Sequence, residues 1–213
     1  CGARMLAANG RFLAQPRRPR VLVPRPALIP ARANLPERLF LIGFMGSGKT
    51  TLGRLLAERL KWDFIDLDTR IEEMAGIPIR RVFESRGESH FRKLEHEALR
   101  AVTADRGRSI VALGGGAFVS EVNRAVIRRA GVSVWIDAPF RIVSRRILGD
   151  RKRPLAQTAE QIHQLYRARL PFYHEADIRM RVGDATPNRI AREVLRVLRE
   201  DWSIVAERRR LFP

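Results

Sequence analysis

The chain has 213 residues, 45% of them hydrophobic, which fits one globular domain and excludes a largely disordered protein. Its single cysteine is Cys1, so no disulfide framework or cysteine metal site can form within one chain. This pattern is typical of a reducing compartment, and we expect a cytoplasmic location. No apolar stretch approaches the roughly 20 residues that a transmembrane helix needs, so we expect no membrane partner.

The formal net charge of +18 is unevenly distributed along the chain. Residues 1–36 contain seven arginines, six of the twelve prolines and no acidic residue, and we interpret them as a flexible extension outside the fold. We interpret residues 201–213 as a solvated basic tail. A DNA-binding protein would need a helix-turn-helix segment, for which residues 1–36 are too short and too rich in proline. We therefore expect no nucleic-acid partner, since an enzyme with anionic substrates has its own reason to be basic.

From residue 37 onwards, strand-like and helical patterns alternate. Strands are predicted at 38–42, 62–66, 109–113, 132–136 and 178–182. Helices are predicted at 49–60, 69–75, 78–104 with breaks, 121–130, 139–148, 158–170 and 187–200. This alternation indicates an α/β fold with a parallel sheet, whose ligands bind at the carboxyl ends of the strands. The residues that follow each strand are therefore the first candidates for a site.

The segment after the first strand, Gly43–Thr50, reads GFMGSGKT and fills every fixed position of the phosphate-binding pattern GxxxxGK[ST]. Glycines permit a tight loop whose N–H groups point at phosphate oxygens, and the following helix N-terminus favours anions. Lys49 would reach the β- and γ-phosphates, and the Thr50 hydroxyl would bind Mg²⁺. The sequence therefore predicts a nucleoside triphosphate site, which we favour over a glycine-rich turn with a chance lysine.

Two carboxylates end the second predicted strand. Asp66 and Asp68 are two residues apart, so in an extended segment they would point the same way, towards the phosphate loop. One could bind Mg²⁺ while the other accepts hydrogen bonds from substrate hydroxyls. The alternative for Asp68 is a structural role as the N-cap of the next helix.

Two further groups of residues are candidates for binding the second substrate. Arg92 and Glu95 share a face of a predicted helix, although such a pair by itself is usually a surface salt bridge. Gly114–Gly116 directly follows an apolar strand, which indicates either close approach of a ligand to the backbone or a flexible turn.

Arg169 lies on the apolar stripe of its predicted helix, which is unfavourable unless an anion meets the charge. Because Pro171 follows closely, a solvent-exposed helix end is the alternative. The basic segment Gly149–Arg153 could close over a phosphoryl group, although without other motifs a solvated loop would be the simpler interpretation.

In combination, these motifs resemble the shikimate kinase family in order and spacing, over about residues 38–200. The motifs that carry the resemblance are residues 43–51, residues 64–68 with Ile71 and Glu72, residues 87–88 with Phe91, Arg92 and Glu95, residues 114–117, residues 153–155, and Arg169 with Tyr173. The resemblance implies a P-loop kinase fold, with a five-stranded parallel sheet flanked by helices, a lid and a substrate-binding helical region. It also implies that ATP and Mg²⁺ are used to phosphorylate the 3-hydroxyl of shikimate, a step of aromatic amino-acid biosynthesis.

The resemblance further assigns roles to single residues. The ATP-binding residues would be Gly46, Ser47, Gly48, Lys49, Thr50 and Thr51, with Arg146 and Pro187 near the adenine and Arg153 as the lid arginine. Thr50 and Asp66 would serve Mg²⁺, and Lys49, Asp66 and Arg153 would be catalytic. Asp68 would receive the ring hydroxyls, Arg92 and Arg169 the carboxylate, and Gly115 and Gly116 would approach the substrate with their backbone. Glu95 would orient Arg92.

Two alternatives stay open from the sequence. Another small-molecule P-loop kinase is possible, because gluconate also carries hydroxyls and a carboxylate. The other alternative is a regulator that uses a kinase-like domain to sense a ligand. We expect a monomer whose partners are ATP and shikimate.

Overall fold

The computed structural model describes residues 36–148 and 158–200. The basic extension expected at residues 1–36, apart from Pro36, the lid expected at Gly149–Arg153 and the tail 201–213 lie outside the described residues.

Five parallel strands form one sheet with the order β2-β3-β1-β4-β5. The strands are β1 (Arg38–Ile42), β2 (Asp63–Asp66), β3 (Ser109–Ala112), β4 (Val132–Asp137) and β5 (Ile178–Arg181). The central strand β1 is buried along its whole length, because β3 and β4 flank it and helices cover both of its faces. The predicted fold class, a five-stranded parallel sheet flanked by helices, is therefore confirmed.

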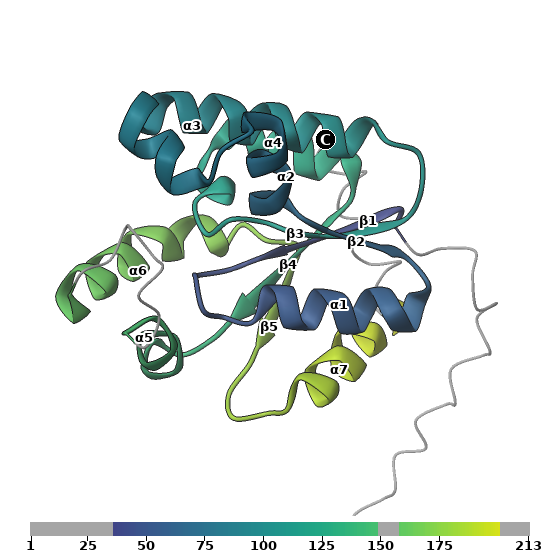
Figure 1. Ribbon diagram of the computed structural model, residues 1–213. Coiled ribbons are helices and arrows are strands. Elements are labelled where there is room, and N and C mark those ends of the chain that lie inside the picture. The colour runs from purple at the N-terminus through teal and green to yellow at the C-terminus, as the bar shows by residue number, and fades with distance from the viewer. Residues whose placement is uncertain (1–35, 149–157, 201–213) are drawn as a thin grey trace, which may run out of the picture. The chain divides into compact units, whose positions relative to one another are not determined.

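Helices occupy both faces of this sheet (Figure 1). They are α1 (Lys49–Leu60), α2 (Leu67–Ala75), α3 (Ile79–Ala104), α4 (Glu121–Ala130), α5 (Phe140–Leu148), α6 (Ala159–Tyr173) and α7 (Pro187–Glu200), with a short 3₁₀ turn, η1, at Ala117–Val119. Helices α1 and α7 lie together on one face, and α2, α3 and α4 lie on the other. No helix within the described ranges is both long and apolar enough to cross a membrane.

Two predicted boundaries were wrong in ways that bear on the site. Helix α2 begins at Leu67, directly after β2, rather than at residue 69. Helix α6 continues past Pro171 to Tyr173, although a proline in a helix removes a backbone donor. Burial of the Tyr173 ring, which is 1% exposed, accounts for the extra turn, since tertiary packing outweighs local preference.

Helix α3 bends at Gly87, where the expected break falls. Its backbone there has φ 75° and ψ 175°, a conformation that favours glycine. The bend joins two helical segments, and the second of them carries Arg92 and Glu95.

Candidate active site

The loop after β1 has the shape that the phosphate-binding pattern predicts. Gly46 and Gly48 have φ angles of 75° and 97°, which residues with a side chain rarely adopt. Helix α1 begins immediately afterwards, at Lys49, so its N-terminal N–H groups face the loop. The Lys49 ammonium donates hydrogen bonds to the carbonyl oxygens of Gly43 and Phe44, each at 3.0 Å, which holds it above the loop.

Thr50 and Asp66 come together as the sequence analysis expects. The Thr50 hydroxyl donates to Oδ2 of Asp66 at 3.0 Å, which joins the start of α1 to the end of β2. A hydroxyl and a carboxylate at this distance are hard oxygen donors of the kind that Mg²⁺ prefers. We call residues 43–51, together with Asp66, the phosphate-loop half of the site.

A cavity of about 420 Å³ opens at this end of the sheet. Its lining includes all six predicted residues of the phosphate loop, together with Asp66, Asp68, Gly114, Gly115, Arg146 and Pro187. The Arg146 guanidinium donates to the Gly46 carbonyl oxygen at 2.9 Å, so it lies against the phosphate loop. The cavity thus brings together residues from five separate stretches of the chain.

The expected geometry of the two aspartates needs correction. Asp66 and Asp68 are not in one extended segment, because α2 begins at Leu67 and Asp68 lies in its first turn. The capping role also falls on Asp66, whose Oδ1 accepts from the Asp68 N–H at 3.2 Å. Both carboxylates nevertheless line the cavity, since a strand end and the first helical turn after it face the same opening.

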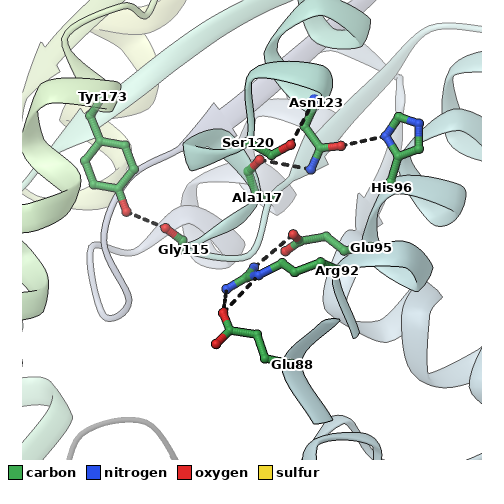
Figure 2. A network of polar contacts seen from close by, with 9 residues as sticks. All are labelled: Glu88, Arg92, Glu95, His96, Gly115, Ala117, Ser120, Asn123 and Tyr173. Atoms are coloured by element: carbon green, nitrogen blue, oxygen red, sulfur yellow. Dashed lines mark hydrogen bonds and ion pairs between the residues drawn. The ribbon is translucent and has the colours of Figure 1, made fainter. Parts of the chain in front are cut away.

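Arg92 is held between two carboxylates of its own helix (Figure 2). It contacts Glu95 at 2.9 Å and Glu88 at 2.9 Å. Glu95 is 1% exposed, so this pair differs from an ordinary surface salt bridge. Burial raises the pKa of Glu95, while the Arg92 charge acts against that rise. Burial opposes the charge on Arg92, but Glu95 and Glu88 outweigh it and hold its pKa above the usual value.

The segment that follows β3, residues 114–119, is here called the glycine loop. A Cβ on Gly114 would lie 2.6 Å from Oδ1 of Asp68, and one on Gly116 would lie 2.7 Å from Nη1 of Arg92. A Cβ on Gly115 would lie 2.9 Å from Nη1 of Arg169. The glycines therefore leave room for charged side chains of the protein to approach the backbone closely, which argues against a merely flexible turn.

Arg169 is buried, with 7% of its surface exposed, so the alternative of an exposed helix end is wrong. Its guanidinium lies over the ring of Phe44, 5.6 Å from the centroid. One helical turn later, the Tyr173 hydroxyl donates to the Gly115 carbonyl oxygen at 2.6 Å (Figure 2). We call Asp68, Arg92, Glu95, Arg169 and the glycine loop the arginine half of the site.

Sequence reasoning missed three contributors to the arginine half. Phe44 occupies a variable position of the phosphate-loop pattern, so nothing marked it. Glu88 lies one turn before Arg92, a spacing that could have indicated the second ion pair. Tyr173 was part of the resemblance but had no role, although its spacing of four from Arg169 places both on one helix face.

Comparison with known proteins agrees with this architecture. The sequence profile described as "Shikimate kinase" matches residues 45–199. A shikimate kinase of Geobacter sulfurreducens is 42% identical over 167 residues, covering 77% of this chain and 92% of the relative.

Two solved structures add to this comparison. The "Shikimate kinase from Acinetobacter baumannii in complex with shikimate" is 33% identical, with a TM-score of 0.74, and the match covers 78% of this chain and 94% of that one. A gluconokinase from Sinorhizobium meliloti is 17% identical with a TM-score of 0.53, over 83% of this chain and 99% of that one, and shares the fold alone. With its profile match, its relatives and the two-part site, this chain belongs to the shikimate kinase family.

Proposed function

We propose that this protein transfers the γ-phosphoryl group of ATP to the 3-hydroxyl of shikimate. The main observation in support of this proposal is that the two halves of the site lie next to each other at one edge of the sheet. A phosphate loop and Asp68 line the same cavity, and two arginines adjoin it across the glycine loop. Shikimate offers the hydroxyls and the carboxylate that such a pairing would recognise.

In the phosphate-loop half, backbone N–H groups and Lys49 would hold the β- and γ-phosphates. Lys49 already bonds two loop carbonyls, so its ammonium is oriented before a nucleotide arrives. Arg146 and Pro187 would lie along the rest of the nucleotide, in keeping with their place in the cavity lining. Arg153 lies outside the described residues and stays a prediction from the sequence.

Mg²⁺ is part of the proposal. Thr50 and Asp66 would hold it, because their oxygen atoms suit a hard cation. Within residues 36–148 and 158–200 no cluster of three or more His, Cys, Asp or Glu could hold a metal, which fits an ion that takes most of its ligands from phosphates and water. When bound, the ion neutralises charge on the phosphate oxygens.

In the arginine half, the guanidinium groups of Arg92 and Arg169 would hold the carboxylate of shikimate. The Asp68 carboxylate would accept a hydrogen bond from the attacking hydroxyl and take its proton. The hydroxyl oxygen then bonds to the γ-phosphorus as the bond to the leaving ADP oxygen breaks. Catalysis in this scheme is mainly positioning and charge stabilisation.

The proposal also covers the cellular location, the oligomeric state and the partners of the protein. We infer a cytoplasmic monomer that acts on small molecules, without a nucleic-acid or membrane partner. The sensing-domain alternative is disfavoured because the phosphate-loop half retains its lysine, its hydroxyl and its carboxylate.

A coupled ADP-release assay with shikimate, quinate, gluconate and a nucleoside monophosphate side by side tests the function. We expect turnover to be highest with shikimate. Turnover that is highest with gluconate would replace the proposed substrate, and no turnover with any acceptor would favour the sensing domain.

A further inference from the structure

Side chains from two sides bind the carbonyl oxygens of the glycine loop (Figure 2). From α6, the Tyr173 hydroxyl donates to Gly115 at 2.6 Å. From α4, the Asn123 amide donates to Ala117 at 3.0 Å, and Nη1 of Arg124 donates to the next two carbonyls, at 3.1 and 2.8 Å. Four carbonyl oxygens of the glycine loop, those of Gly115, Ala117, Phe118 and Val119, therefore accept hydrogen bonds from side chains of helices α4 and α6.

The orientation of Asn123 is fixed by what it contacts. Its side chain is 1% exposed, and a carbonyl oxygen such as that of Ala117 can only accept, so the amide NH₂ must face it. The amide oxygen then faces Nδ1 of His96 at 2.8 Å. Since an amide oxygen also only accepts, His96 must carry a proton on Nδ1. The chain from His96 to Ala117 thus has one direction, with each group donating to the next.

His96 belongs to α3, the helix that carries Arg92 and Glu95. It follows Glu95 directly and lies one turn beyond Arg92 on α3. Arg92 packs against Gly116 so closely that a Cβ there would lie 2.7 Å from its Nη1. A shift of the glycine loop would therefore displace the Arg92 guanidinium, and the hydrogen bonds through Asn123 resist that shift.

We propose that Asn123 and His96 are positioning residues of the arginine half. They set the distance between the glycine loop and α3, so that the backbone of Gly115 and Gly116 and the Arg92 guanidinium meet shikimate together. This inference rests on the proposed function.

The decisive variant is Asn123→Asp, which keeps the shape but places an oxygen against the Ala117 carbonyl. We expect the KM for shikimate to rise about tenfold or more, because a buried acceptor loses its donor and the loop shifts. The KM for ATP should change less than about twofold, since the phosphate-loop half does not depend on the hydrogen bonds from His96 through Asn123 to Ala117. Asn188→Asp is the matched control: it is the same change at an exposed residue that bonds only Arg59 among the described contacts, and both KM values should stay as they are.

His96→Ala is the second variant, at a half-buried position that tolerates truncation more readily. It should also raise the KM for shikimate, but by a smaller factor than Asn123→Asp. In the double variant, the fold increase in this KM should be smaller than the product of the two single increases, because the two residues act through the same hydrogen bonds. If Asn123→Asp fails to fold, His96→Ala decides the question by itself.

Two outcomes would overturn the positioning role. One is an unchanged KM for shikimate in a folded variant, and the other is an equal rise in both KM values, which would indicate a general loss of structure. If the unmodified protein fails to phosphorylate shikimate in the same assay, the proposed function fails instead, and the two failures are thereby told apart.

Discussion

The two halves of the site are built in different ways. The phosphate-loop half comes mainly from one stretch, residues 43–51, whose glycines and helix start create the binding geometry locally. The arginine half collects Asp68 from α2, Arg92 and Glu95 from α3, the glycine loop, and Arg169 from α6. A local site tolerates changes elsewhere in the fold, whereas an assembled site depends on packing between elements.

The halves also differ in how they handle charge. The phosphate-loop half uses backbone dipoles and one ammonium that bonds to carbonyl oxygens. The arginine half buries charged groups and pairs them, as in the contact between Arg92 and the almost fully buried Glu95. Because an unpaired buried charge is strongly unfavourable, single substitutions should disturb the arginine half more widely.

The sharpest test of this contrast is Lys49→Ala. We expect turnover to fall about 10²-fold or more, because the ammonium stabilises phosphate charge in the transition state. The melting temperature should stay nearly unchanged, since the ammonium acts on phosphate charge and Lys49 is not part of the hydrophobic core. Lys93→Ala, at an exposed lysine on α3, is the control and should keep full turnover. Near-normal turnover in Lys49→Ala would remove the phosphate-loop half from the mechanism.

Arg169→Lys probes the arginine half. Lysine keeps the charge but loses the planar fork over Phe44, so we expect the KM for shikimate to rise roughly tenfold to a hundredfold. The KM for ATP should change little. Arg167→Lys, an exposed arginine on the same helix, is the matched control. A collapse of ATP affinity in Arg169→Lys would reassign this arginine to the phosphates.

Gly116→Ala tests how tightly the arginine half is packed. The backbone there, with φ −101° and ψ −17°, accepts alanine, but the new Cβ would lie 2.7 Å from Nη1 of Arg92. The guanidinium is the flexible end of its side chain and should move, so we expect the KM for shikimate to rise about tenfold, with a moderate loss of stability because Nη1 also bonds the buried Glu95. A large drop in melting temperature instead would show that the loop backbone, rather than Arg92, gives way.

The same contrast explains what the sequence could predict. The phosphate-loop half follows from one contiguous motif, and the strands and helices follow from alternating hydrophobic periods, so both could be predicted. The contact of Arg169 with Phe44, and the chain from His96 to Ala117, join residues far apart in the sequence, which no local pattern predicts. The early start of α2 was missed because Asp66, rather than Asp68, caps it.

Tyr173 offers a last and smaller test, through its titration. Burial raises the pKa of its phenol to about 12, although the nearby Arg169 charge offsets part of this effect. The pKa in the folded protein thus lies above the unfolded value of about 10, so the contribution to stability is complete below about pH 10 and is lost as the pH rises towards 12. A shift of this size corresponds to about 3 kcal/mol.

The chain contains two tyrosines, so Tyr166→Phe leaves Tyr173 as the only phenol. We expect its tyrosinate absorbance to appear near pH 12 in the folded variant and near pH 10 in urea. We also expect a difference in the free energy of unfolding, measured with urea. Between pH 9 and pH 11.5 this free energy should fall by roughly 2 kcal/mol less in Tyr173→Phe than in the unmodified protein. A midpoint near pH 10 in the folded variant would mean that solvent reaches the hydroxyl, and that its bond to Gly115 does not hold the arginine half from the α6 side.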